Sequence, residues 1–195
     1  MKKCKVLLFN DFETLDVFGP VEVLAYIKDI DVELSSITGG LIKAYQGYEV
    51  KTTKLDNSPF DILLVPGGQG TRQLVDDSAF LAMLDKQIEL SEFVLSVCTG
   101  AALLAKTNWL DNKAATTNKQ AFKWVSALNS TVLWRRRARW VVDSPIYTSS
   151  GVSAGIDMTL GFIAEQYGYN IAKEIANSIE YIWNEDAEQD FFAVK

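Results

Sequence analysis

The sequence predicts an α/β fold, a three-layer sandwich in which helices cover both faces of a mostly parallel β-sheet. Short runs that are apolar throughout, such as 5–9 and 61–65, are typical of strands buried on both faces. Segments with the three- and four-residue apolar spacing of helices are interleaved with these runs. In addition, the run 93–105 passes from strand to helix at Cys98 and Thr99, as a nucleophile elbow does.

The predicted strands are short apolar or alternating runs that end at turn residues. In chain order they are 5–9, 31–37, 42–55 (a hairpin that turns at Gln46-Gly47), 61–65, 93–97, 114–117, 132–142 and 146–149. Ligand sites in parallel sheets lie at the carboxyl ends of the strands. We therefore expect three loops to meet there, namely 10–18, 66–70 and Cys98-Thr99.

The predicted helices lie between these strands and at the end of the chain. They are 21–27, 78–90, the segment after Thr99, 120–128, 151–167 and 170–183. Pro20 suits the first turn of the first helix, where its missing N–H is not needed. Gly168 separates the last two helices, and the acidic and aromatic tail after Asn184 follows them.

Bulk composition indicates one domain in a reducing compartment. A chain of 195 residues that is 48% hydrophobic can bury about 70% of its unfolded surface, and no linker divides residues 1–195. Its two cysteines, Cys4 and Cys98, do not form a disulfide framework, so we expect a cytoplasmic protein. The apolar run 6–9 is too short for a signal peptide, and no run approaches about 18 apolar residues, so we expect no membrane association.

The charge and the absence of histidine narrow the function. A net charge of -6 argues against nucleic acid as a partner. The basic cluster 134–140 would suit phosphate contacts, although a solvated face is the favoured interpretation in an acidic chain. Because the chain has 0 histidines, Ser-His-Asp and Cys-His-Asp triads and histidine-rich metal sites are excluded. Cysteine chemistry would therefore run without its usual base.

Cys98 is the candidate nucleophile. At an elbow it lies at a helix N-terminus, where unpaired N–H groups favour the thiolate, the reactive form of cysteine. The alternative is a small buried hydrophobe. The N–H groups of Gly67, Gly68 and Thr99 would form an anion hole for charge that develops in the transition state, whereas Pro66-Gly67-Gly68 is otherwise a plain tight turn.

Asp16 has two interpretations that the residues alone leave open. As a structural residue it caps the helix that follows. As a functional residue its carboxyl lies beside a thiol in an apolar loop, where desolvation raises its pKa and lets it hold and deliver a proton.

As a set, these residues resemble the ThiJ/PfpI superfamily, the class I glutamine amidotransferase-like fold, and within it the isonitrile (isocyanide) hydratase branch. The matching stretches keep their order along the chain: L-D-V-F-G-P-V-E-V-L (15–24), L-L-V-P-G-G (63–68), S-V-C-T-G-A-A-L-L-A (96–105), L-D-N-K-A-A-T-T-N (110–118), R-W-V-V-D (139–143) and T-S-S-G-V-S-A-G-I-D-M-T-L (148–160). The resemblance implies a flavodoxin-like sandwich with a nucleophile elbow.

The resemblance also implies roles, residue by residue. The nucleophile falls on Cys98, the acid that contacts it on Asp16, and the oxyanion loop on Gly67 and Gly68. Thr99 follows the cysteine as it does in the hydratase branch. Protease and amidotransferase branches involve a histidine with the cysteine, and this chain has none, so those activities lose support.

The implied activity is a lyase reaction, the hydration of an isocyanide to an N-substituted formamide, without metal or organic cofactor. Phe18, Ile156 and Met158 would furnish apolar walls for this small-molecule substrate, although core packing is the favoured interpretation for all three. Asn118 stands in the pocket where many relatives carry histidine. A homodimer is expected. The alternative function is a non-catalytic ligand- or oxidation-sensing module, related to the ligand domain of AraC-type regulators.

Overall fold

The computed structural model describes residues 1–193, and an eight-stranded sheet lies at their centre. The strands follow one another across the sheet as β3 (Gly40–Lys43), β4 (Glu49–Lys54), β2 (Ile30–Ser36), β1 (Lys2–Leu7), β5 (Phe60–Val65), β6 (Ser91–Ser96), β10 (Ile146–Ser149) and β9 (Trp140–Asp143). All pairs from β4 to β10 are parallel, and β3 and β9 are antiparallel edge strands. The predicted mostly parallel sheet is confirmed.

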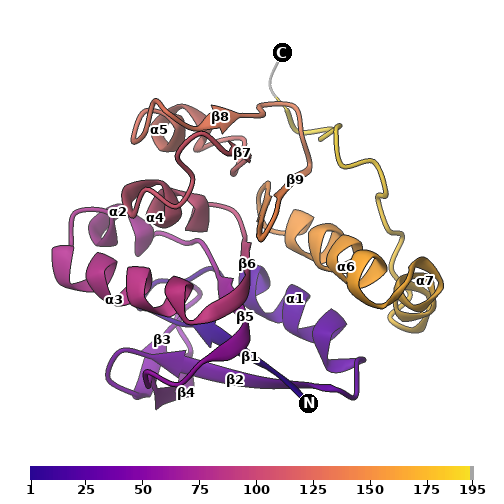
Figure 1. Ribbon diagram of the computed structural model, residues 1–195, viewed down its shortest axis with the longest axis horizontal. Helices are drawn as coiled ribbons and strands as arrows, with labels where there is room; N and C mark the ends of the chain where they lie inside the picture. Colours follow the sequence, from indigo (N-terminus) through magenta and orange to yellow (C-terminus); the bar gives the residue numbers. More distant parts are fainter. Residues whose placement is uncertain (194–195) are drawn as a thin grey trace.

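Helices cover both faces of this sheet (Figure 1). On one face lie α1 (Thr14–Ala25), α6 (Ala154–Tyr167) and, packed on α6, α7 (Tyr169–Ser178). On the other lie α2 (Thr71–Leu74), α3 (Ser78–Glu89) and α4 (Gly100–Lys106). A small unit of α5 (Phe122–Ser126) with the two-stranded sheet of β7 (Ala114–Ala115) and β8 (Leu133–Trp134) packs on α4. The three-layer sandwich is therefore confirmed.

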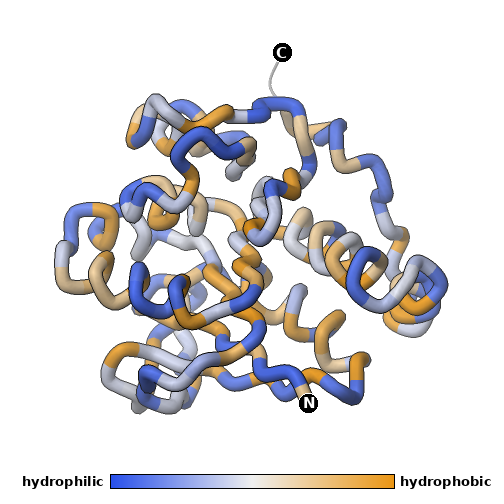
Figure 2. Tube along the Cα trace, in the orientation of Figure 1, coloured by the Kyte–Doolittle hydropathy of each residue, from blue (hydrophilic) through white to orange (hydrophobic). Residues whose placement is uncertain are grey.

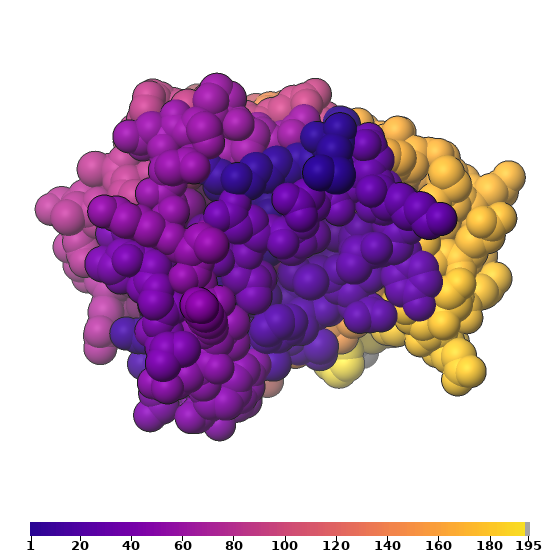
Figure 3. All heavy atoms as spheres, turned by 90° about the horizontal axis from the view of Figure 1, so that it is seen from below, coloured from indigo at the N-terminus to yellow at the C-terminus, as the bar shows by residue number. Residues whose placement is uncertain are grey.

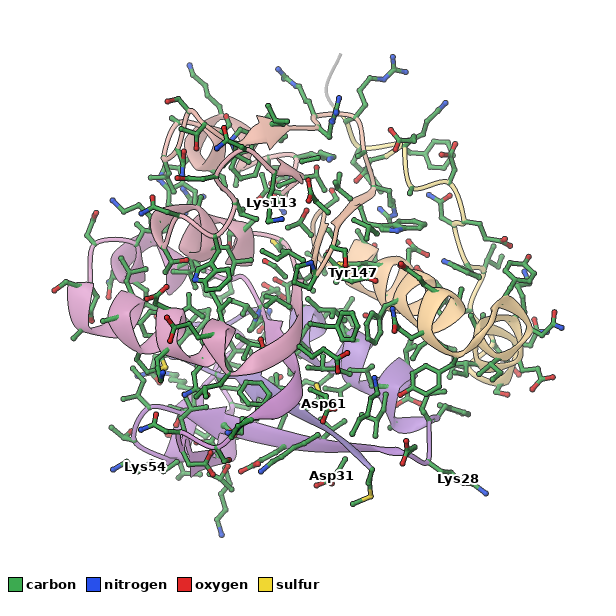
Figure 4. The ribbon with its side chains drawn as sticks, in the orientation of Figure 1. Lys28, Asp31, Lys54, Asp61, Lys113 and Tyr147 are labelled. Atoms are coloured by element: carbon green, nitrogen blue, oxygen red, sulfur yellow. The ribbon has the colours of Figure 1, made fainter. Side chains whose placement is uncertain are left out.

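The central strands form the core because their side chains are apolar on both faces. The four residues 62–65 of β5 are fully buried, as are Val6 and Leu7 of β1. Figure 2 shows hydrophobic stretches concentrated in these strands and hydrophilic stretches on the outer turns. Aromatic side chains fill the space toward α6, where the Tyr147 ring lies 5.2 Å from that of Phe162 (Figure 4).

Three predicted boundaries are wrong, and one of them is the end of the last helix, which was predicted at residue 183 and lies at Ser178. The first helix begins at Thr14 and not at residue 21, so Asp16 and Pro20 both lie inside α1. Pro20 removes the N–H that would bond to the Asp16 carbonyl four residues earlier, and α1 continues past this gap. The predicted strand 132–142 is split into β8 and β9, because Arg139 turns inward while the three arginines before it stay exposed.

The chain after α7 packs along the body and does not fray within the described residues. The N–H of Arg139 donates to the Ala187 carbonyl at 2.7 Å, and the Trp183 indole donates to the Asp157 carbonyl at 3.1 Å. Seen from below, the N-terminal half of the chain covers most of the view, and the C-terminal part lies along one side of it (Figure 3). Lys28 and Asp31 lie at the amino ends of the parallel strands (Figure 4). The loops predicted to meet therefore lie at the opposite, carboxyl ends of these strands.

Candidate active site

The nucleophile elbow at Cys98 is confirmed. β6 ends at Ser96, α4 begins at Gly100, and Cys98 between them has φ 58°, a left-handed conformation that strains any residue with a Cβ. Two hydrogen bonds hold the strained unit, since its N–H donates to the Ser150 carbonyl at 3.1 Å and its carbonyl accepts from the Thr117 hydroxyl at 2.7 Å. Gly100 is required because a Cβ there would lie 2.4 Å from the Val65 carbonyl oxygen.

Cys98 lies at a cavity and not in the sealed core. The residue is 6% exposed, and its cavity has a volume of about 380 Å³. The cavity wall is mainly polar and is formed by Glu13, Tyr45, Gly68, Gln69, Arg72, Cys98, Thr99, Asn118, Gln120, Ala121 and Val152. These residues come from the loops after β1, β5, β6 and β10, from the β3–β4 hairpin and from the unit that carries α5, so the carboxyl-end loops do meet.

Asp16 is a buried acid beside this thiol and does not cap α1. The N-cap position belongs to Glu13, and no side chain caps the helix. Asp16 is fully buried, and its Oδ2 accepts a hydrogen bond of 2.9 Å from the N–H of Gly67. Its Oδ1 has no hydrogen-bond partner among residues 1–193. The capping interpretation is therefore wrong, and the carboxyl retains capacity for a proton or a ligand.

The electrostatics of the pair differ from the expected resting thiolate. Burial raises the pKa of Asp16 to about 8, against the lowering effect of the Gly67 N–H. Burial also raises the pKa of the Cys98 thiol, and the nearby Asp16 carboxylate raises it further. Hydrogen bonds from the Val152 and Thr99 N–H groups and from the Asn118 amide lower the thiol pKa in part. Near neutral pH the resting site therefore holds a thiol next to a mostly protonated carboxyl.

The glycine loop does not offer the open anion hole that was expected. The N–H of Gly67 is occupied by Asp16, and the N–H of Gly68 donates to the Thr99 hydroxyl at 3.0 Å. A Cβ on Gly67 would lie 2.5 Å from the Thr99 nitrogen, so only glycine allows this approach. Both glycines therefore position side chains of the site. The amides that face the sulfur are those of Thr99 and Val152.

Asn118 contacts the sulfur directly. Its Nδ2 donates to Cys98 Sγ at 3.3 Å, while its Oδ1 accepts from the Ala121 N–H at 3.0 Å and so fixes which way the amide points. Gly151 makes room for this amide, because a Cβ there would lie 2.3 Å from Nδ2. Of the four residues predicted for the pocket, Asn118 is the one that lines the cavity.

The other three predicted pocket residues do not line this cavity. Phe18 and Ile156 border a separate groove between α1 and the end of α7, and Ile156 packs against Gly19. Met158 is fully buried in the core. Core packing was the favoured interpretation for these residues, and Met158 follows it.

Val152 is a site residue that the sequence analysis did not single out. It has φ 47°, and its N–H faces both Cys98 and Asp16. The stretch T-S-S-G-V-S (148–153) was a matching motif, so the signal was present without a role attached to it. Across residues 1–193 no three Cys, Asp or Glu side chains are grouped to share a metal ion. No helix of this part of the chain is long and apolar enough to cross a membrane.

Comparisons with known proteins identify a family and several relatives. A model of the DJ-1/PfpI family matches residues 2–165. An isonitrile hydratase of Pseudomonas putida is 32% identical over 177 residues, which cover 90% of this chain and 76% of that protein. The HTH-type transcriptional regulator GlxA of Rhizobium meliloti is 28% identical over 71% of this chain, and the match spans 43% of the regulator.

Among solved structures, a ThiJ/PfpI family protein from Pseudomonas syringae shares the fold. Its TM-score is 0.81 at 21% identity, and the match covers 92% of this chain and 75% of that one. At this level of identity the likeness concerns the fold alone.

Proposed function

The chain belongs to the DJ-1/PfpI family, and we propose that it hydrates isocyanides to N-substituted formamides, with Cys98 as nucleophile and Asp16 as acid and base. One observation carries the proposal. In a chain with 0 histidines, a fully buried carboxyl with a pKa near 8 lies beside a thiol at the bottom of a cavity. Such a carboxyl does the work of an imidazole, because it both holds and releases a proton near neutral pH.

In the first step, the terminal carbon of R–N≡C receives both a sulfur and a proton. The Cys98 sulfur forms the S–C bond while Asp16 gives its proton to that carbon, and the thiol proton passes to Asp16 in exchange. The product is a thioimidate, R–N=CH–S–Cys98. While charge grows on the sulfur, the Thr99 and Val152 N–H groups and the Asn118 amide stabilise it.

In the second step, water adds to the thioimidate carbon. Asp16 takes a proton from this water and delivers its own proton to the nitrogen. Collapse of the tetrahedral intermediate breaks the C–S bond, so the formamide R–NH–CHO leaves and the sulfur regains a proton. One water is consumed, and the site returns to thiol and protonated carboxyl without a cofactor.

The test is turnover of an alkyl and an aryl isocyanide by wild type, Cys98→Ala and Asp16→Asn, with formamide measured by NMR. We expect turnover in the wild type, none in Cys98→Ala, and a loss of about 100-fold or more in Asp16→Asn. Circular dichroism checks that both variants keep the fold. Absence of turnover in the wild type, or its persistence in Cys98→Ala, would overturn the proposal.

A ligand- or oxidation-sensing role is the second candidate, and the match to a transcriptional regulator favours it. The raised pKa of the Cys98 thiol weighs against oxidant sensing, because the thiolate is the form that oxidises. A Cys98 that accumulates as a stable sulfinate, in a protein without turnover, would support the sensor. The homodimer and the cytoplasmic location stay predictions, and sedimentation measures the first of them.

A further inference from the structure

The cavity above Cys98 carries an arginine that the hydration chemistry does not use. Among the cavity residues, Arg72 is basic, Glu13 is acidic, and the remainder are neutral polar or small side chains. Arg72 projects from α2, directly after the glycine loop that positions Asp16 and Thr99. The guanidinium and the Cys98 thiol therefore line one cavity, although they come from different loops.

The position of this guanidinium is fixed by stacking. Its Cζ lies 3.5 Å from the centre of the Trp124 ring, which belongs to α5. Stacking on a ring face leaves the N–H edges of the guanidinium free, and those edges match both oxygens of a carboxylate. Within residues 1–193, Arg72 forms no ion pair and no hydrogen bond to another side chain, so its five donors are available.

The acidic residue of the cavity does not neutralise Arg72. Glu13 accepts a hydrogen bond of 2.6 Å from the Gln46 side chain, which holds it toward the β3–β4 hairpin. It forms no salt bridge with Arg72 among the described residues. Asp16, which is buried beside Cys98 and does not itself line the cavity, is mostly protonated near neutral pH and so does not repel an anion.

We propose that Arg72 binds a carboxylate at the end of the substrate remote from the isocyanide carbon, which makes isocyano carboxylates the substrate class. The inference rests on the proposed function and adds to it the residue that selects the substrate. A volume of about 380 Å³ suits a small molecule of this kind, with the isocyanide at Cys98 and the carboxylate at the cavity wall near α2.

The first experiment compares each acid with its methyl ester. The substrates are isocyanoacetate and its two homologues that are one and two methylene groups longer, because the best chain length reports the span from sulfur to guanidinium. In the wild type we expect kcat/KM to be higher for at least one acid than for its ester. In Arg72→Gln the kcat/KM of the acid divided by that of its ester should fall by about ten-fold. The fall should come mainly from a higher KM for the acid, because the variant loses a charged hydrogen bond at a solvent-accessible position.

The matched control is Arg136→Gln. Arg136 is also exposed and also lies over an aromatic ring, 5.8 Å from the centre of Phe122, but it does not line the cavity. In Arg136→Gln the ratio of kcat/KM for acid and ester should equal that of the wild type. An equal fall in both variants would mean a general effect of surface charge, and an unchanged ratio in Arg72→Gln would overturn the proposal.

A second experiment separates this inference from the hydratase proposal. N-formylglycine, the product expected from isocyanoacetate, and its methyl ester are titrated into wild type and Arg72→Gln by NMR, with no turnover required. Tighter binding of the acid, lost in Arg72→Gln, would support the carboxylate site even if no isocyanide is hydrated. Equal binding of acid and ester to the wild type, or no binding of either, would contradict it.

Discussion

Two fully buried aspartates, Asp16 and Asp157, show how the same residue becomes either reactive or structural. Burial raises the pKa of both. Asp157 is surrounded by donors: Arg139 donates to its Oδ2 through Nε at 2.8 Å and pairs with the same oxygen through a terminal nitrogen at 2.7 Å. Its Oδ1 accepts from the Tyr181 hydroxyl at 3.1 Å and from the Asn184 N–H at 3.0 Å.

Asp16 has no cationic partner among the described residues. The N–H of Gly67 donates to its Oδ2, and the Val152 N–H and the Cys98 thiol also lie beside the carboxyl. A buried carboxylate is expensive unless it is paired, so Asp16 keeps its proton near neutral pH whereas Asp157 is held as an ion by Arg139. The difference teaches that a paired cation, and not burial itself, separates a structural ion from a proton carrier.

The largest effect should come from breaking the ion pair of Asp157. Asp157→Ala leaves the Arg139 guanidinium buried with only the more distant carboxylate of Asp190 at 3.6 Å. We expect the free energy of unfolding to fall by about 3–5 kcal/mol, measured by urea denaturation. Glu185→Ala is the control, because it removes a solvent-exposed ion pair with Lys173 and should cost much less stability. Similar losses in the two variants would break the comparison.

The next effect concerns the pH dependence of stability. The pKa of Asp16 is 3.8 in its ordinary state and about 8 in the folded protein. Between these values the unfolded chain releases a proton that the folded chain keeps, so stability falls as pH rises. The slope from this one group is at most about 1.4 kcal/mol per pH unit.

Urea denaturation of wild type and Asp16→Asn at several pH values between 4 and 8 isolates this slope, because the other titrating groups are common to both proteins. The wild type should lose stability relative to Asp16→Asn as pH rises through this range. Parallel curves would show that Asp16 is ionised in the folded state, as Asp157 is.

The local part of this site was predictable from sequence, and the long-range part was not. Cys98 at the elbow and the three converging loops follow from runs of residues that a parallel sheet forces to one edge. Nothing local pairs Arg139 with Asp157, since the first lies in an irregular segment and the second inside a helix 18 residues later. The basic cluster 134–140 therefore contains three exposed arginines and one buried arginine, Arg139, which has a structural role.

The sequence also did not predict which side chains of α1 and α6 face the cavity. Phe18 and Ile156 are apolar and belong to the matching motifs, but α1 and α6 place both side chains at a groove between these helices and not at the cavity of Cys98. Val152 contributes through its backbone N–H, which no residue pattern reveals. The same holds for the glycine amides, whose partners are set by how closely the loops approach one another.

The smallest effect tests strain, a second respect in which the two regions differ. Asp157 lies in a regular helix, whereas the site around Asp16 contains Cys98, whose φ is 58°. At an ordinary position, glycine is less stable than alanine by about 0.5–1 kcal/mol. At Cys98 the order should reverse, because alanine retains the Cβ that is strained at positive φ and glycine does not.

We therefore expect Cys98→Gly to be more stable than Cys98→Ala by about 1 kcal/mol in urea denaturation. Both variants lack the thiol, so the change in its burial and in its coupling to Asp16 cancels between them. If alanine is the more stable of the two, the elbow is not strained. The position of the sulfur would then be the result of packing alone.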